Sequence, residues 1–233
     1  MENRYNEKYF RIIDRNYERR IDRLRFITLL HFVKNVNSIL DAGCGSGYYL
    51  PVLSKKCKTL YGVDNSLASI KKSIEVTKKY DLNAKIYRSD ISKRIPIKNK
   101  KIDIILCTET IEHIKNVDGV LKEFNRILKN NGKVIVSVPN FTPFSFEYLR
   151  EVVSERDPTH VHRYTLKKWK NILNRYFLVE KGVTSTFLVS YFLFSLGMKI
   201  KDIVKIEDLI RKLPLIKNLG RECIFILKKK NNN

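Results

Sequence analysis

Three acidic residues each follow a short apolar run, where they could bind a polar ligand. Asp41 ends the run 38–41 and stands just before the glycines of 43–47, while Asp64 ends the run 59–64 and Asp90 follows the run 84–88. Open α/β sheets bind ligands at the carboxyl ends of their strands. Glycine lets the backbone turn sharply and approach a ligand closely. We therefore expect these acids to line one ligand site.

The glycine spacing separates this turn from a dinucleotide-binding turn, which uses Gly-x-Gly-x-x-Gly. Here the third glycine is Gly47, and Tyr48 stands at the position that the pattern gives to glycine. Tyr48 and Tyr49 would crowd a pyrophosphate at the start of the next helix. A carboxylate at Asp41 repels phosphate and attracts a cationic amino group, and Asp64 is suitably placed for ribose hydroxyls. The turn favours an adenosyl amino acid as its ligand.

Histidines are the second group of candidate reactive residues, because imidazole titrates near a pH of about 6.5 and can take a proton from a hydroxyl. His160 and His162 would face the same side of an extended segment, and His113 follows the fourth predicted strand. His160 is our first choice as a base and His162 the second, with His113 a third candidate. Asp157 could join His160 and His162 in a metal site, but no fourth ligand is evident, and we predict no metal.

Alternating strand and helix patterns predict the elements that must position these residues. Strands are expected over 38–41, 59–64, 84–88, 102–107, 133–138, 176–181 and 221–228, and helices over 48–55, 66–79, 118–129 and 165–173. Asn65 or Ser66 would cap the second of these helices and Thr165 the last, while Asn131-Gly132 would close the helix over 118–129. The order predicts the α/β class, with a doubly wound, mainly parallel sheet.

The expected domain organisation has four parts. Residues 1–35 form an N-terminal helical segment, within which His31 is structural, and residues 36–182 form the core. A helical insertion or lid covers 183–220, and 221–233 supply the last strand and a tail. The insertion contains the apolar stretch 187–196, interpreted as a buried helix, a lid over an apolar substrate, a dimer face or a membrane-surface contact.

Composition bounds the partners and the compartment. The formal net charge is +22, which favours an anionic partner such as nucleic acid or an acidic membrane. The lysines are spread along the chain, which equally suits a solvated surface. Four cysteines without a Cys-x-x-Cys pair indicate a reducing cytoplasm. The N-terminus has no apolar signal core, and no apolar run approaches the roughly 20 residues of a membrane span. We predict a cytoplasmic protein, with peripheral membrane contact left open and no prediction of oligomeric state.

The run Leu40-Asp41-Ala42-Gly43-Cys44-Gly45-Ser46-Gly47 resembles motif I of the class I S-adenosylmethionine-dependent methyltransferases, in particular type 11/23 domains and those like the ubiquinone and menaquinone biosynthesis enzymes. The resemblance continues through Gly62-Val63-Asp64, Ser89-Asp90-Ile91 and Thr110-Ile111-Glu112-His113, and covers about residues 36–140. It implies a Rossmann-like, seven-stranded sheet with an antiparallel last strand.

The same resemblance implies S-adenosyl-L-methionine as the cofactor and a role for each matching position. Asp41 would lie near the cofactor ammonium group and Asp64 at the ribose hydroxyls, with Asp90 accepting from the adenine amine. The glycine turn would contact the methionine part, and the end of the fourth strand would approach the sulfonium. The implied cofactor-binding residues are Asp41, Gly43, Cys44, Gly45, Gly47, Asp64, Asn65, Asp90, Ile91, Cys107 and Thr108.

The implied activity is methyl transfer to an O or N nucleophile of a small-molecule, lipid-like or glycan-linked acceptor. One alternative is an RNA or other nucleic-acid methyltransferase, favoured by the charge. Amine methylators of nucleic acids often carry Asn/Asp-Pro-Pro-Tyr after the fourth strand, where this chain has Cys107-Thr108-Glu109-Thr110. That difference disfavours base N-methylation but not ribose methylation. The other alternative is a non-catalytic, cofactor-binding partner subunit. Glu112 is expected to orient a helix start.

Overall fold

The structure is a computed structural model that describes residues 29–30, 32–145, 147–149, 158–185 and 188–230. Nearly all of the predicted N-terminal helical segment, with His31, lies outside these residues, and so does Asp157. The described part therefore bears on the predicted core and on most of the predicted insertion.

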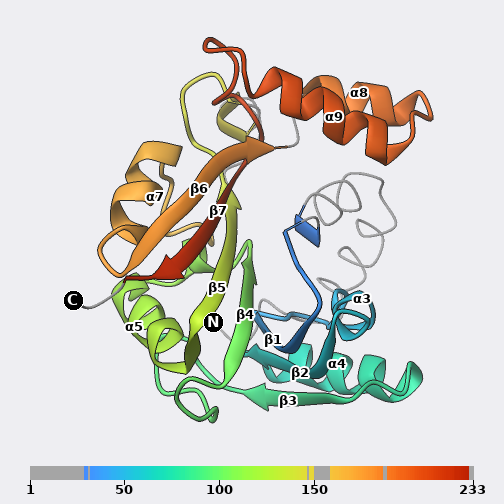
Figure 1. Ribbon diagram of the computed structural model, residues 1–233, viewed down its shortest axis with the longest axis vertical. Coiled ribbons are helices and arrows are strands. Elements are labelled where there is room, and N and C mark those ends of the chain that lie inside the picture. The colour runs from blue at the N-terminus through green and yellow to red at the C-terminus, as the bar shows by residue number, and fades with distance from the viewer. Residues whose placement is uncertain (1–28, 31, 146, 150–157, 186–187, 231–233) are drawn as a thin grey trace.

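A seven-stranded sheet organises the molecule, in the order β3-β2-β1-β4-β5-β7-β6 (Figure 1). β7 pairs antiparallel with both of its neighbours, whereas the pairs among β1 to β5 are parallel. The predicted seven-stranded, mainly parallel sheet with an antiparallel last strand is confirmed. The strands are β1 (Val36–Ala42), β2 (Cys57–Asp64), β3 (Ala84–Arg88), β4 (Ile102–Thr108), β5 (Leu128–Pro139), β6 (Phe177–Ser185) and β7 (Glu222–Lys229).

Helices cover both faces of the sheet, and alternate strand residues therefore pack into different clusters. In β1, Leu40 belongs to the cluster formed with α5 (Val117–Ile127) and α7 (Leu166–Leu173). Its neighbour Ile39 belongs to the cluster formed with α3 (Leu50–Ser54). A strand that is buried on both faces reads as a continuous apolar run, which is why 38–41 is recognisable as a central strand. The doubly wound prediction is confirmed.

Two of the predicted helix ends agree with the structure, and one does not. Ser66 Oγ accepts from the Ser69 amide at the start of α4 (Leu67–Lys79), and Thr165 Oγ1 accepts from the Lys168 amide at the start of α7. The predicted close of the third helix at Asn131-Gly132 is wrong. The chain passes from α5 directly into β5 at Leu128, and both positions lie inside that strand.

Leu128 explains this difference. It is fully buried and extended, and it pairs with Ile102 of β4, whereas Ile127 is buried as the last residue of α5. Two consecutive apolar residues thus belong to two different elements, and helical spacing alone could not divide them.

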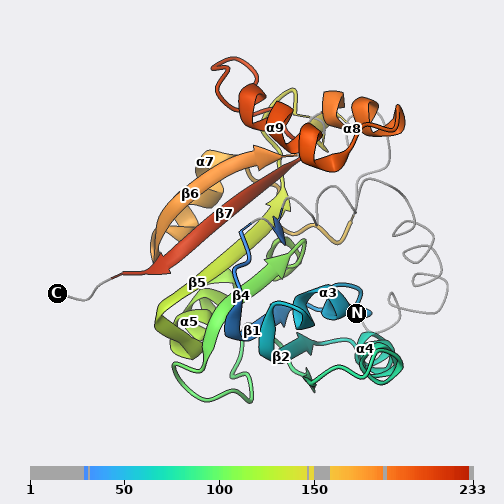
Figure 2. The ribbon, with the colours of Figure 1, turned by 45° about the vertical axis from the view of Figure 1, so that its right-hand side comes forward.

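Two helices, α8 (Leu188–Ser195) and α9 (Ile200–Ile210), follow β6 and precede β7 in the chain. They lie at one end of the sheet (Figures 1 and 2). The strand before them ends at Ser185, beyond the predicted end at 181. Ser185 Oγ donates to Glu207 Oε2 at 3.0 Å and the Arg211 guanidinium donates to the same carboxylate at 2.6 Å. This buried network fastens α9 to the end of β6.

The expectation that the apolar stretch 187–196 is a fully buried helix is wrong for several of its described side chains. Val189, Phe192 and Leu196 are exposed, whereas Ser190 is buried. In the part of the chain that the structure describes, none of the helices combines the length and apolarity needed to cross a membrane.

Candidate cofactor and acceptor site

Asp41 and Asp64 lie side by side because β1 and β2 are parallel neighbours whose carboxyl ends meet. The turn after β1 is fastened to β2 by the amides of Gly43 and Cys44, which donate to the Val63 carbonyl at 2.7 and 3.0 Å. The Asp64 carboxylate then accepts from the Gly45 amide at 3.0 Å and from the Ser66 amide at 2.8 Å. We call this arrangement of Asp41, Asp64 and the turn 43–47 the acid edge.

Two glycines of the turn cannot be replaced without movement. Gly43 and Gly47 have φ angles of +82° and +81°, a region that residues with a Cβ avoid. A Cβ on Gly43 would overlap the side chain of Thr110, and one on Gly47 would lie 3.0 Å from the Ser73 Cα. The turn therefore packs directly against the segment that follows β4.

Asp41 has the properties of a carboxylate that receives a cation. It is only 1% exposed, and neither of its carboxylate oxygens has a hydrogen-bond partner among the described residues. Burial raises the pKa of Asp41 to about 7, and the nearby Asp64 charge adds to the rise. Such a group is unfavourable unless an opposite charge joins it. An ammonium group fits this requirement, and a phosphate does not.

Asp64 is kept closer to the ionised form. Burial raises its pKa, but the hydrogen bonds from the Ser66 and Gly45 amides oppose that rise. A carboxylate held in this way at the end of β2 suits the paired hydroxyls of a ribose. The acid edge thus fits the cationic and ribose-bearing parts of S-adenosylmethionine.

The remaining cofactor-binding candidates lie around this edge with mixed exposure. Asp90 Oδ1 accepts from the amide and hydroxyl of Ser92 at 2.9 and 2.7 Å, while Ile91 is buried in the core cluster on one face of the sheet. Asn65 is exposed, and its carbonyl accepts from Arg88 Nε at 3.1 Å. Their adenosine contacts stay predictions.

Cys107 and Thr108 end β4, the central neighbour of β1. Both are buried, and Thr110 Oγ1 donates to the Thr108 carbonyl at 2.8 Å. Burial raises the pKa of the Cys107 thiol well above its ordinary value, with the charges of Glu112 and Asp41 adding to the effect. Cys107 is therefore a neutral thiol that is electrostatically close to both carboxylates. Its proximity to the sulfonium stays a prediction.

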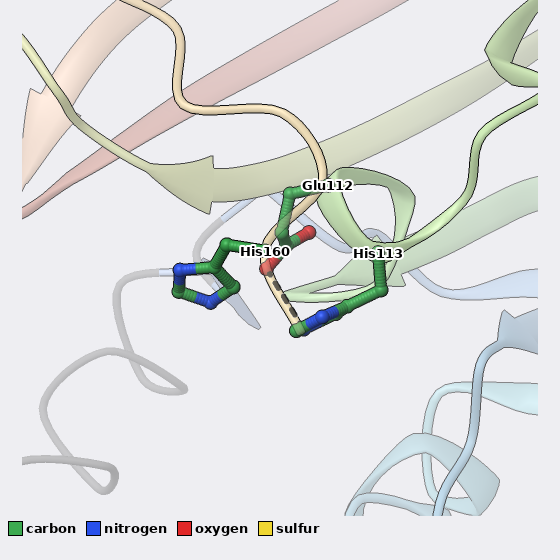
Figure 3. A group of neighbouring side chains, drawn as sticks. All are labelled: Glu112, His113 and His160. Carbon is green, nitrogen blue, oxygen red and sulfur yellow. Dashed lines mark ion pairs between the residues drawn. The ribbon is translucent and has the colours of Figure 1, made fainter. Parts of the chain in front are cut away.

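A second group of polar side chains follows β4, and we call it the histidine cluster: Glu112, His113 and His160 (Figure 3). Glu112 and His113 belong to the short 3-10 helix η2 (Ile111–His113), and His160 comes from the segment before α7. One potential ligand atom from each residue lies within 4.8 Å of the others. The His113 and His160 ring centroids are 4.9 Å apart.

Backbone hydrogen bonds hold the two parts of this cluster together. The Glu112 carbonyl accepts from the amides of Val161 and His162, each at 3.0 Å. His113 Nδ1 lies 3.0 Å from the Thr159 carbonyl oxygen. The segment carrying His160 is thus clamped onto η2 from both sides of that residue.

His162 is placed differently from His160, contrary to the expected shared face. Its Nε2 lies 3.0 Å from the Ile114 carbonyl and its Nδ1 lies 3.1 Å from the Tyr164 hydroxyl, and its ring packs against Trp169. A bend at Val161 breaks the alternation of an extended segment. Both ring nitrogens of His162 are engaged, so we assign it to holding the loop rather than to proton transfer.

The sequence points to His113, His160 and Glu112 separately and does not group them. His113 and His160 are 47 positions apart, and no local spacing rule joins residues at that distance. Asp157, the carboxylate that sequence paired with His160, lies outside the described residues. The available signal was the pair Glu112-His113, a few positions after the central strand β4.

A surface depression of about 400 Å³ lies elsewhere, and Pro51, Ser54, Cys57, Tyr80 and Asn83 contribute to its lining. It adjoins the start of β2 and the end of α4, at the amino edge of the sheet. Ligands of open parallel sheets bind at the carboxyl edge, and none of the predicted site residues lines this depression.

Fold and site together indicate a class: a doubly wound α/β domain whose first two strands end in acids that fit a cationic, ribose-bearing cofactor. A family model described as a methyltransferase domain matches residues 5–176. The chain therefore belongs to this family, within the class I S-adenosylmethionine-dependent methyltransferases.

Individual relatives agree with this assignment over part of their length. A ubiquinone biosynthesis O-methyltransferase of Pelagibacter ubique is 31% identical over 122 residues, which are 50% of this chain and 47% of that protein. The chain thus spans about half the length of this curated relative.

Solved structures support the fold. A SAM-dependent methyltransferase from Archaeoglobus fulgidus is similar with a TM-score of 0.66 and 19% identity, covering 95% of this chain and 100% of that one. One from Aquifex aeolicus has a TM-score of 0.60 and 18% identity, covering 88% of each chain.

Proposed function

We propose that this protein transfers the methyl group of S-adenosylmethionine to a hydroxyl oxygen of a small-molecule or lipid-like acceptor. The observation that carries the proposal is the histidine cluster, which follows the central strand β4 and is joined to the acid edge through Thr110, packed against Gly43. A hydroxyl must lose its proton to become a good nucleophile, whereas a neutral amine need not. A site that gathers two imidazoles and a carboxylate beside the cofactor turn suits an oxygen acceptor.

The acid edge would hold the cofactor. Asp41 would accept from the ammonium group, Asp64 would accept from the ribose hydroxyls, and the glycine turn would leave room for the methionine chain. When bound, S-adenosylmethionine supplies a methyl group that is already activated on a sulfonium sulfur. The main task of the protein is then alignment of the acceptor oxygen with that methyl group.

The histidine cluster would receive the hydroxyl proton. His160 is the first candidate and His113 the second, since His162 is engaged on both nitrogens. As the hydroxyl proton leaves, an oxygen lone pair forms the new C–O bond and the C–S bond breaks toward sulfur. The products are a methyl ether and the neutral thioether form of the cofactor.

Two further observations favour oxygen over nitrogen. Two curated relatives, each matched over about half of its own length, are named ubiquinone biosynthesis O-methyltransferases. The residues after β4 lack the Asn/Asp-Pro-Pro-Tyr run of base N-methylators.

A second candidate acceptor is RNA, through a ribose hydroxyl, because the chain carries a net charge of +22. Contact with nucleic acid or an anionic membrane stays a prediction.

Methyl transfer to defined acceptors tests the proposal. The purified protein is supplied with S-adenosylmethionine and, separately, a phenol, a catechol, an aliphatic alcohol, an aromatic amine and an RNA oligonucleotide. Mass spectrometry should detect methylation of an oxygen in a small hydroxyl compound. His160→Gln should lower that rate without changing cofactor affinity, whereas Glu180→Gln on the far edge strand β6 should leave both unchanged. Methylation of the amine or of RNA alone would sink the proposal.

A further inference from the structure

We propose that Ser73 is a positioning residue for the cofactor, whose hydroxyl holds the glycine turn 43–47 in the shape that receives S-adenosylmethionine. Ser73 lies in the middle of α4, and it belongs to none of the motifs that the sequence offers. The inference rests on the proposed function for the identity of the cofactor, and it does not depend on the acceptor.

The hydroxyl of Ser73 bonds outside its own helix. Serine in a helix interior often bonds to the carbonyl one turn earlier. Ser73 is fully buried, and its Oγ instead donates to the Gly45 carbonyl at 2.7 Å, 28 positions earlier in the chain. The helix approaches the turn closely here, since a Cβ on Gly47 would lie 3.0 Å from the Ser73 Cα. Alanine is the better helix former, so the hydroxyl at this position serves the turn rather than the helix.

Two hydrogen bonds fix the peptide groups on either side of the Gly45 Cα. The Gly45 amide donates to Asp64 Oδ2 at 3.0 Å, and the Gly45 carbonyl accepts from Ser73. Gly45 has a φ of +52°, and a Cβ there would meet no atom within 4 Å. Side-chain packing therefore does not hold this most flexible type of residue in place. The bonds to Asp64 and Ser73 do so instead.

The Cys44 thiol adds a further link to this arrangement. A serine hydroxyl has one proton, and that of Ser73 goes to the Gly45 carbonyl. Cys44 Sγ lies 3.7 Å from Ser73 Oγ, so the proton shared in this pair comes from the thiol. Burial raises the pKa of Cys44 well above its ordinary value, with the charges of Asp41 and Asp64 adding to the rise. The thiol thus keeps its proton and supports Ser73 from behind.

The consequence for binding is preorganisation. A turn that is already held in the bound shape loses less conformational freedom when the ligand arrives. Without the Ser73 hydroxyl, the peptide group after Gly45 can rotate, and the amide that orients Asp64 loses its fixed neighbour. Only part of the population then has the competent turn, and the apparent affinity falls by that fraction. Methyl transfer from the bound complex is unaffected, because the bound turn has the same shape.

Calorimetry of the full-length protein with the demethylated cofactor tests the inference. Ser73→Ala should raise the Kd by roughly three- to tenfold, the effect of one hydrogen bond. Ser73→Cys keeps a weaker donor and should give an intermediate Kd. The control is Thr77→Val on the same helix, whose hydroxyl donates to the Ile74 carbonyl at 2.8 Å; its Kd should equal that of the wild type.

Two further measurements separate positioning from a purely structural role. In the cofactor-free protein, hydrogen exchange of the peptide that contains 43–47 should be faster in Ser73→Ala, while the midpoint of urea unfolding stays near that of the wild type. With a methylated hydroxyl compound as acceptor, the KM for S-adenosylmethionine should rise in proportion to the Kd and kcat should stay constant.

The possible failures are distinguishable. Equal Kd values for wild type and Ser73→Ala, or for wild type and Ser73→Cys if the alanine variant does not fold, would overturn the role of Ser73 and leave the proposed function standing. A loss of affinity matched by Thr77→Val would also overturn it. A raised Kd in Ser73→Ala without methylation of any hydroxyl compound would support the role of Ser73 and overturn the proposed acceptor.

Discussion

The acid edge and the histidine cluster lie next to each other but are built in opposite ways. The acid edge comes from one stretch, residues 41–64, and successive backbone amides of the turn hold it on β2. The histidine cluster joins η2 to a segment 47 positions later, through hydrogen bonds to the Glu112 carbonyl and the His113 ring. Local structure thus shapes the cofactor side, while long-range contacts shape the acceptor side.

The two regions also differ in how their charges are balanced. Asp41 is buried without a hydrogen-bond partner in the described part of the chain, which leaves it available to a cationic ligand. Glu112 has His113 Nε2 at 3.6 Å within its own cluster. Changes at the acid edge should therefore act on cofactor binding, and changes at the histidine cluster on methyl transfer.

His160→Ala is expected to give the largest difference between an effect on catalysis and an effect on cofactor binding. Loss of the group that serves the hydroxyl proton should lower kcat by roughly 10²- to 10⁴-fold, while the Kd for S-adenosylmethionine stays unchanged. Single-turnover kinetics and calorimetry measure the two quantities on the same preparation. A parallel loss of cofactor affinity would show that the two regions do not act separately.

The raised pKa of Asp41 should make the stability of the protein depend on pH. Its pKa is raised from 3.8 to about 7 in the folded protein, so the folded state holds a proton that the unfolded state releases. The contribution of Asp41 to stability should be full below pH 3.8 and fall as the pH rises toward 7, by at most about 4 kcal/mol. Urea unfolding of wild type and Asp41→Asn should diverge over that window, with the variant the more stable at pH 8.

The affinity for the cofactor should rise with pH over the range in which the contribution of Asp41 to stability falls. The ammonium group binds the ionised carboxylate, so the affinity of the wild type should rise as the pH passes through about 7. Asp41→Asn should bind weakly and without that rise. A wild-type affinity that is flat from pH 5 to 8 would contradict the pairing of Asp41 with the ammonium group.

Two glycine variants should separate packing from backbone strain within the acid edge. Gly43→Ala introduces a Cβ onto Thr110 at a φ of +82°, and we expect a loss of roughly 2 to 3 kcal/mol in unfolding free energy. Gly45→Ala meets no atom within 4 Å at a φ of +52°, and should cost only about 1 kcal/mol. Equal losses, measured by urea unfolding, would mean that Thr110 moves aside.

The smallest effect on ligand binding is expected from Asp64→Ala. Loss of hydrogen bonds from the ribose to a carboxylate should weaken S-adenosylmethionine binding by at least about 1.5 kcal/mol, close to tenfold in Kd. Calorimetry with the demethylated cofactor gives the comparison without turnover. An unchanged affinity would remove Asp64 from the cofactor site and shift attention to Asp90.

Sequence patterns alone predicted the sheet and the cofactor turn, for a physical reason. Central strands such as 38–41 and 102–107 are apolar on both faces, and glycines at 43 and 47 are required by backbone angles that few other residues adopt. Both signals are local in the chain. Where an apolar run served two elements, as at Ile127 and Leu128, the predicted boundary was wrong.

Only the tertiary structure decided which histidines meet. His160 and His162 look equivalent in sequence, yet one packs on His113 and the other on Tyr164 and Trp169. The choice depends on hydrogen bonds from the loop to the Glu112 carbonyl and on the bend at Val161. Contacts between distant segments form only when the sheet brings them to one edge, and no spacing along the chain encodes that meeting.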